Sequence, residues 1–520
     1  MRDELSNKIE YFETLKTKRE KWNAVWDELK KYVCPQTTGN KEIFDSTSIW
    51  SREQLASGLQ SLMVNRAIKW FNINLLEQEG SEDEQPLNEL PEVKLWLETI
   101  ENTILNIFNN PGSNFYNQIH EFFLNLAAFG TSIFYVEEEP DLRSGLFFRN
   151  ISLTECYFEE DKYGFVNSMY RLFTVNVKTA ANKWSDFAPF KEKLLKDPDE
   201  QIEILHIVAP ANEKSKTNRK TTQHGYSSEY IYLAEQKIIS ESGYSYFPFF
   251  VTRWIKEEGE VYGYAPAHHV LPDIKLLNSF RKTGIQVVQK QEQPSWLIPK
   301  DGYHLPLRDT PGASNFFRNG TLDKISPLNR VENPMCTELQ QDKCRDAIFK
   351  ASYIDIFRMQ KENKEMTATE VQIRNEEQMR MMSPMVGRIE TEFLNPLIRA
   401  IYGILAKYNK LPILEGINAL PDIEVSYVSP LTRAQKSSAV NSIEQVIGFF
   451  QRSGISNFCP EIYDNINWDL CFKLLAEHRG IPQSILRPDK EVMQIRQQRK
   501  AAQMQQQQMQ QMGAGNENFN

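Results

Sequence analysis

The sequence predicts a helix-rich α+β fold. Apolar residues at helical spacing dominate the first 129 residues and return beyond residue 271, whereas β-branched and aromatic runs separated by turn residues lie between them. Hydrophobic residues make up 41% of the 520-residue chain, which is enough for a large core. By length alone the chain suggests about three domains.

Composition excludes several classes of protein. No apolar run approaches the roughly 18–20 residues of a bilayer span, so we expect no membrane insertion. The first 22 residues alternate in charge and lack the apolar segment of a secretory signal, which predicts assembly in a cytoplasm. A net charge of −9 argues against a protein that simply coats nucleic acid. The six cysteines form no CxxC pair, and we expect reduced thiols.

Four helices are predicted at the start of the chain. Cys34 and Pro35 end the first of them, because proline cannot continue a helix. Asp45 or Ser46 is the expected N-cap of the second. The predicted helices cover residues 1–33, 44–65, 90–109 and 114–129.

The chain changes character after Gly130. Short runs rich in β-branched and aromatic residues predict strands, and the polar stretch 211–225 predicts an exposed loop. Together with the preceding helices, these strands predict an α+β block over residues 1–271. The predicted strand regions are 131–139, 145–153, 155–161, 165–175, 229–240 and 247–255.

The second half is mainly helical. A helix is predicted over 272–293, followed by a proline-rich insert of loops and strands over 294–334 and a second helix over 335–360. A long helix then runs from 367 to about 409. We expect three residues to bend it, Pro384, Gly387 and Pro396. The remaining expected elements are a strand at 423–430, helices at 431–454 and 468–480, and a Gln- and Met-rich tail at 489–520.

A charged break separates two of these helices. Residues 361–366 read KENKEM and have no apolar residue before Met366. Thr367 and Glu370 then form a T-x-x-E capping box, which restarts the helix at a defined angle. Taken alone, such a stretch is usually an ordinary solvated turn.

The sequence offers no anchor for catalysis. No phosphate-binding loop of the form GxxxxGK[ST], no GxSxG nucleophile elbow and no HExxH motif is present. His268 and His269 are adjacent, so their side chains point in different directions and suit one metal ion poorly. The acidic runs at 136–141 and 158–161 are typical of solvated strand ends. We therefore expect no enzymatic activity and no cofactor.

Six phrases of the sequence occur together and in a recognisable order across about residues 20–500. They read WDELKKYVCP (26–35), FDSTSIWSREQLASGLQSLM (44–63), NFYNQIHEFFLNLAAFGTSIFYVEE (114–138), YGYAPAHHVLPDIKLLN (262–278), EMTATEVQIRNEEQMRMMSPMVGRIETEFLNPLI (365–398) and YVSPLTRAQK (427–436). In this combination the chain resembles the head-to-tail connecting (portal) proteins of short-tailed, T7-like bacteriophages. One departure is SLMVNRAIKWF (61–71), which lacks the proline that the family pattern has near the tryptophan.

This resemblance implies a ring, usually a dodecamer, at one vertex of the virion capsid. Double-stranded DNA would be pumped in through the ring by a separate terminase ATPase and would leave by the same channel. A tail adaptor and the major capsid or scaffolding proteins would contact the ring. The absence of a nucleotide-binding motif agrees with a conduit rather than a motor.

The resemblance also implies a division of each subunit into parts. The predicted elements supply these parts in the family's order. They are a wing (1–271), stem helix 1 (272–293), a clip (294–334), stem helix 2 (335–360), a tunnel loop (361–366), a bent helix and strand returning to the wing (367–428), a crown (429–488) and a Gln-rich barrel or disordered tail (489–520).

Candidate site residues follow from this division. Lys361 and Lys364 of the tunnel loop would face the channel and contact DNA, and ring symmetry would repeat them as a positive collar. A strongly basic bore would trap DNA, because each lysine–phosphate contact releases counterions and adds affinity. Thr367 and Glu370 would cap the exit from this loop.

The stem and the clip supply further candidates. Lys275, Lys282 and Lys290 lie on several faces of stem helix 1, and some would face the channel while others would pair with acids of the next subunit. The clip residues Trp296, Phe316 and Phe317 are candidates for subunit and adaptor contacts, with core packing an equal alternative for each.

Two other classes of protein stay open from the residues alone. One is a non-channel virion scaffold or tail component whose Gln-rich end mediates assembly. The other is an enzyme, which would need a catalytic set that the sequence does not display.

Overall fold

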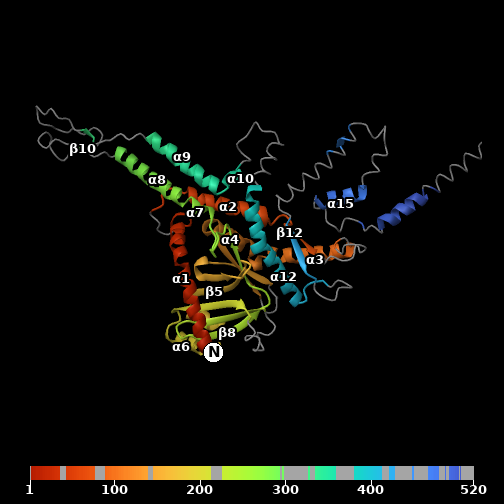
Figure 1. Cartoon of the computed structure of the whole chain (residues 1–520), viewed down its shortest axis with the longest axis horizontal. Coiled ribbons are helices and arrows are strands. Elements are labelled where there is room, and N and C mark those ends of the chain that lie inside the picture. Colours follow the sequence, from red (N-terminus) through yellow and green to blue (C-terminus); the bar gives the residue numbers. More distant parts are fainter. Residues whose placement is uncertain are drawn as a thin grey trace, which may run out of the picture.

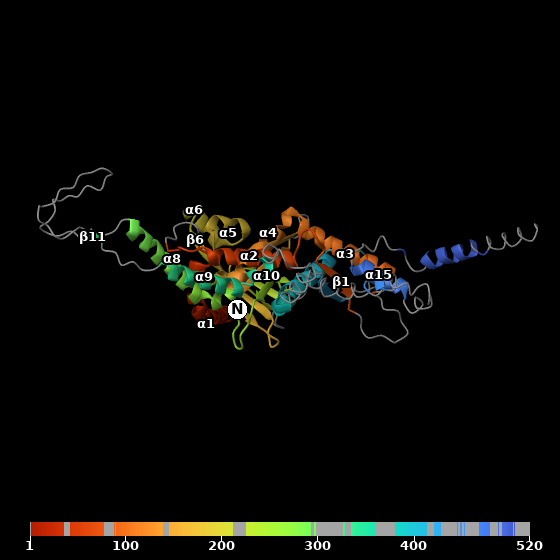
Figure 2. The same cartoon turned by 90° about the horizontal axis from the view of Figure 1, so that it is seen from above.

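The computed structural model is a flat, elongated molecule (Figures 1 and 2). A body of helices and sheets carries a two-helix arm, which extends to the upper left in Figure 1. The residues described are 2–35, 42–76, 88, 90–138, 145–211, 225–292, 296–297, 326–327, 334–358, 380–412, 421–427, 445, 448–449, 452, 467–478, 487, 491–502 and 504.

The first two helices lie where the periodicity predicts them. Helix α1 spans Arg2–Tyr32 and α2 spans Thr47–Met63. Of the two expected caps of α2, Ser46 makes no side-chain capping bond. The Asp45 carboxylate instead accepts the backbone N–H of Thr47 at 2.9 Å, as an aspartate preceding a helix commonly does.

A three-stranded antiparallel sheet of order β3-β2-β9 lies at the centre of the body. Residues 131–136 of β2 are all buried, because other elements cover both faces of the sheet. One face packs on α2, α3, α4 and the helix of residues 380–407, and the other packs on the second half of α1 and on the bases of α8 and α9. The bounds are β2 (Thr131–Glu138), β3 (Leu146–Ile151), β9 (Phe249–Arg253), α3 (Pro91–Asn109) and α4 (Phe115–Phe129).

Aromatic rings fill the centre of this packing. Phe393 is fully buried, stacks on Phe122 with ring centroids 4.3 Å apart and meets Phe134 edge-on at 5.3 Å. The three rings come from the helix of residues 380–407, from α4 and from β2. Such offset and edge-to-face pairs add to the gain from burial alone. They fix the late helix firmly against the early half of the chain.

A second, five-stranded antiparallel sheet of order β4-β5-β6-β7-β8 forms the lower part of the body (Figure 1). Alternation along β6 divides its side chains between two cores. Leu205 and Ile207 pack with α1, whereas Ile202 and Ile204 pack with α5 and α6. The bounds are β4 (Cys156–Glu160), β5 (Val166–Asn176), α5 (Val177–Lys183), α6 (Ala188–Lys196), β6 (Gln201–Pro210), β7 (Tyr226–Tyr232) and β8 (Lys237–Tyr244).

Two short strands far apart in sequence pair with each other. β1 (Phe71–Leu75) is antiparallel to β12 (Ile423–Tyr427), with Ile73 opposite Val425. The sequence predicts β12 but not β1, because FNINL is short and carries only three apolar residues. The pairing returns the late chain to the early helices.

The two arm helices are α8 (Leu271–Glu292) and α9 (Pro334–Ala351), and α10 (Ile354–Arg358) follows. The prediction of one continuous helix over 335–360 is therefore wrong, because the helix is interrupted between Ala351 and Ile354. Tyr353 has a φ of 55°, in the left-handed region that ends a right-handed helix.

The described part of the long bent helix runs from residue 380 to residue 407. Its irregularity is a π-helical turn at Glu390–Leu394, followed by α12 (Asn395–Lys407). Pro396 has no N–H to donate to the carbonyl of Glu392, so a regular helical bond is impossible there. Pro396 thus lies next to the π-helical turn, whereas residues 380–389, which include Pro384 and Gly387, form regular α-helix. The bend expected at these three residues stays a prediction.

Near the C-terminus, α15 (Trp468–His478) and residues 491–502 are helical. Arg496 holds both oxygens of Asp469 at 2.6 and 2.7 Å, a bidentate pair between the two helices. Among the described residues, no helix combines the length and the apolar character that crossing a bilayer requires.

Candidate functional site

The arm is the most distinctive surface feature of the structure. α8 and α9 leave the body as an antiparallel pair (Figures 1 and 2). At the body, Leu277 and Ile348 are each 1% exposed. Further out, Ile285, Val288 and Leu339 are 39%, 52% and 60% exposed. The arm is thus rooted in the core, while aliphatic side chains farther along it are open to solvent.

A short strap crosses the base of the arm. Residues 42–46 lie against α8, where the Asn278 amide bonds to two backbone groups of the strap. Its Oδ1 accepts the N–H of Phe44 at 2.7 Å, and its Nδ2 donates to the carbonyl of Glu42 at 2.8 Å. The Asn278 side chain therefore pairs with the backbone of the strap as a neighbouring strand would, and it holds the strap against the arm.

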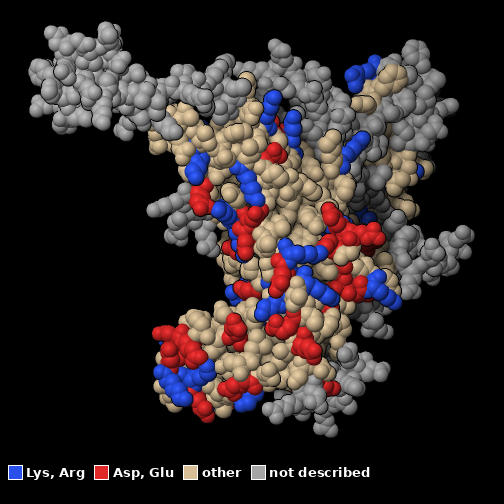
Figure 3. Space-filling view, turned by 60° about the vertical axis from the view of Figure 1, so that its left-hand side comes forward, with Lys and Arg blue, Asp and Glu red and all other residues tan. Residues whose placement is uncertain are grey.

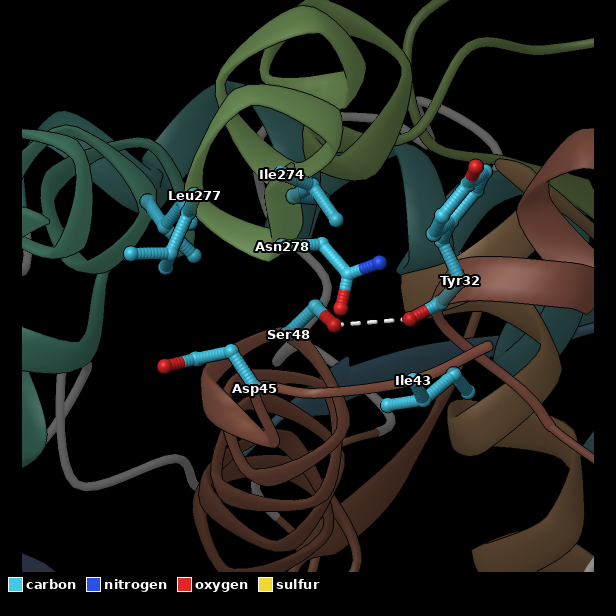
Figure 4. A pocket seen from close by; sticks show the side chains of 8 residues that line it. Tyr32, Ile43, Asp45, Ser48, Ile274, Leu277 and Asn278 are labelled. Atoms are coloured by element: carbon cyan, nitrogen blue, oxygen red, sulfur yellow. Dashed lines mark hydrogen bonds between the residues drawn. The ribbon is translucent and has the colours of Figure 1, made fainter. Parts of the chain in front are cut away.

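Figure 4 shows the joint from close by. Asn278 projects from α8 toward the strap, and the Ser48 hydroxyl donates to the carbonyl of Tyr32 at 2.7 Å, which links α2 to the end of α1. The crevice between these elements is narrow and mostly apolar. Its other walls are Ile43, Asp45, Ile274, Leu277 and Ile348.

An ion pair holds the second arm helix to the same strap. Arg345 of α9 lies 3.3 Å from the Asp45 carboxylate. Burial alone would raise the pKa of Asp45, but the Thr47 donors and Arg345 outweigh it and lower that pKa. Asp45 therefore has two functions, capping α2 and anchoring α9.

Two of the predicted stem lysines are engaged at this base. Lys275 pairs with Glu28 of α1 at 2.5 Å, and Lys282 lies over the Phe44 ring at 5.7 Å. Lys290 belongs to the last turn of α8, and its side chain lies outside the described atoms.

Most of the other predicted site residues lie outside the described residues. Trp296 is placed by its backbone in β10 (Trp296–Leu297), which pairs with β11 (Ser326–Pro327) within the predicted clip. The residues that lie outside the described ranges are Phe316, Phe317, Lys361, Lys364, Thr367 and Glu370.

A buried charged cluster, which sequence reasoning missed, lies inside the body. Arg253 at the end of β9 is 2% exposed. Its Nη2 donates to a Glu392 oxygen at 2.7 Å, and its backbone N–H donates to the other oxygen at 2.9 Å. Its Nε also donates to Glu392 at 3.2 Å, its Nη1 contacts Glu160, and the carbonyls of Gly164 and Val261 accept the other bonds. Every charge in this cluster is compensated, as burial demands.

The cluster joins three parts of the fold. Glu392 lies in the π-helical turn, Arg253 in the central sheet and Glu160 in the five-stranded sheet. Lys256 adds a second cation on Glu160 at 2.6 Å. The one sequence signal was an arginine within the aromatic strand predicted over 247–255, a position where a charge needs a buried partner.

Of the two adjacent histidines, His268 is largely buried and bonds to the backbone. The His268 Nδ1 accepts the N–H of Ala265 at 2.9 Å, and burial lowers the pKa of His268 to about 4. Within the described ranges, no three His, Cys, Asp or Glu side chains come together as a metal-binding group.

Replacing Asn278 by alanine should loosen the strap. Losing these two hydrogen bonds should lower the free energy of local opening of the strap by about 1 kcal/mol. This predicts roughly fivefold faster hydrogen exchange at the amides of residues 42–46. Mass spectrometry of the exchanged peptides measures this. Ser279→Ala, one residue further along α8 and exposed, is the control. Equal exchange in the two variants would contradict the proposed joint.

Replacing Arg253 by methionine should cost about 3–5 kcal/mol of unfolding free energy, because Glu392 is left buried without its cation. Lys21→Met is the matched control, since Lys21 is 64% exposed in its pair with Glu260 and should change stability by less than about 1 kcal/mol. Urea midpoints give both values. A small loss for Arg253→Met would show that the cluster does not hold the fold.

Comparison of the sequence with known proteins shows its family. Residues 6–486 match the family described as "Bacteriophage head to tail connecting protein". A protein of Bordetella phage BPP-1 named "Probable portal protein" is 26% identical over 513 residues, covering 93% of this chain and 89% of that protein. The "Portal protein" of Salmonella phage epsilon15 is 25% identical over 532 residues, covering 96% and 91%.

The family match covers the arm, both main sheets and the buried cluster, which are the features that define the structure. The chain therefore belongs to the bacteriophage head-to-tail connecting protein family.

Proposed function

We propose that this chain is a portal subunit, which assembles into a closed ring at one vertex of the capsid. The ring encloses the channel through which a terminase motor packages double-stranded DNA and through which the DNA is ejected. It is also the docking platform of the tail. The observation that carries this proposal is the arm, rooted firmly at its base and apolar at its exposed outer positions.

The surface of the arm supports association with copies of itself. Exposed aliphatic side chains occur on both arm helices, at Ile285 and Val288 of α8 and at Leu339 of α9. α8 and α9 pack on each other along one side of each helix. The outer side of α8 and the outer side of α9 therefore face different directions. If one surface of a copy binds a different surface of the next copy, the same contact repeats along the assembly. The assembly closes into a ring when the rotation between neighbouring copies divides a full turn. A dodecamer is the arrangement that the family resemblance favours.

The parts of the subunit follow in chain order. Residues 1–271 are the wing, and α8 and α9 are the two stem helices. Residues 294–334 between them are the clip, where Trp296, Phe316 and Phe317 contact neighbouring subunits and the tail adaptor. Residues 429–488 form the crown, and residues 489–520 form a barrel or tail.

DNA passes residues 361–366, the tunnel loop. Lys361 and Lys364 contact its phosphates there, and Thr367 with Glu370 caps the helix that follows. In Figure 3 acidic and basic side chains are interspersed over the visible described surface and do not gather into one basic patch. Mixed charge suits a conduit, because a uniformly basic wall would hold DNA too tightly. Other faces of the ring contact capsid and scaffolding proteins.

The ring is tested directly with purified protein. Native mass spectrometry should give one dominant species near twelve times the 60.6 kDa subunit mass, and negative-stain microscopy should show rings with a central hole. Monomers, open filaments or sheets would contradict the proposal. They would favour a non-channel scaffold or tail component instead.

The tunnel-loop lysines are tested in phage carrying Lys361→Ala with Lys364→Ala. We expect several-fold fewer heads that retain a full genome, because the collar loses its phosphate contacts. Lys16→Ala with Lys18→Ala removes the same charge from an exposed face of α1 and is the control. Unchanged packaging and retention in the tunnel-loop variant would exclude the DNA contact.

A further inference from the structure

We propose that Arg388, together with Lys256, receives a single carboxylate from a neighbouring copy of the chain. This inference rests on the ring proposed above. It assigns a specific ion pair to the face that carries the helix of residues 380–389.

Within the group of side chains around Arg253, cations outnumber carboxylates. Arg253, Lys256 and Arg388 contribute three cations, whereas Glu160 and Glu392 contribute two carboxylates. Both carboxylates are occupied, since Glu392 binds Arg253 and Glu160 binds Arg253 and Lys256. Burial lowers the pKa of Lys256 most, Arg253 and Arg388 lower it further, and Glu392 opposes them. Lys256 and Arg388 are thus close enough for their charges to repel each other.

Arg388 is the cation left over. Within the described part of the chain it makes no hydrogen bond and no ion pair, and its Nη1 is shielded from solvent without an acceptor. Glu392, one turn further along the helix, is turned toward Arg253. A half-buried guanidinium without a counter-charge is costly, and a carboxylate at its open side would offset that cost.

The surface beside Arg388 has the composition of a protein interface. Met381 lies two helical turns earlier on the same face and is 69% exposed. Methionine and arginine are enriched at the centres of protein–protein contacts. In Figure 2 this stretch of the chain lies toward the lower side of the flat molecule, while α5 and α6 lie toward the upper side. A copy that packs against this side therefore meets the helix of residues 380–389.

Charge around the site favours one carboxylate over a nucleic-acid backbone. Glu257 and Glu258 follow Lys256 directly and are exposed, so a polyanion approaching here meets repulsion. A neighbouring copy, with a net charge of −9, offers many single carboxylates. The chemistry is thus that of one ion pair between subunits.

Charge reversal tests the assignment. Arg388→Glu should raise the protein concentration at which rings half-dissociate by about tenfold or more, whereas Arg388→Lys should keep it nearly unchanged. Native mass spectrometry over a dilution series measures both, and circular dichroism confirms that the monomers are folded. Equal ring stability in Arg388→Glu and the natural chain overturns the inference, and absence of rings in the natural chain overturns the proposed function instead.

Cross-linking identifies the partner group. Rings of Arg388→Lys, assembled from equal parts of ¹⁴N- and ¹⁵N-labelled chains, are treated with a carbodiimide, which joins an amine to a contacting carboxylate. We expect mixed-isotope peptides linking position 388 to an Asp or Glu of another copy. Links within one isotope only contradict the inference. Intact rings of Arg388→Glu with fewer packaged genomes also contradict it, and would assign the site to DNA.

Discussion

The structure depends on the burial of one arginine. Arg253 can sit in the core only because Glu392 and Glu160 surround it, and these three residues belong to three elements that are distant in sequence. Satisfying that charge fixes the π-helical turn against the central sheet and the central sheet against the five-stranded sheet. The long late helix is thereby held in one position. The described start of that helix, at residue 380, is held by the same constraint.

The arm obeys a second constraint at its base. Asn278, Arg345 and Lys275 are all engaged with the strap or with α1, so polar groups of the helices serve to orient them. Its outer aliphatic side chains have no comparable cover among the described residues. A fold that orients a pair of helices firmly and leaves their outer surface apolar is incomplete as a monomer. An uncovered apolar surface of this kind suits a member of a family that connects the head of the phage to its tail.

Much of this architecture could be predicted from local pattern. Helical periodicity located α1, α2, α8 and α15, and β-branched runs located β2 and β9, because each is decided by residues a few positions apart. The buried cluster could not be found in this way, since Arg253 and Glu392 are 139 residues apart. Helices as short as α5 and α6 carry little periodicity, and the break at Tyr353 arises from packing. The tunnel-loop lysines and the clip aromatics remain predictions.

We expect the rigidly rooted arms to assemble around a common axis. Electron cryomicroscopy of the purified protein, reconstructed without imposed symmetry, tests it most directly. We expect a closed ring in which the α8–α9 arms of neighbouring subunits lie side by side, with Ile285, Val288 and Leu339 covered by the next copy. Arms that point outward from the ring, or that stay fully solvated within it, would contradict the account.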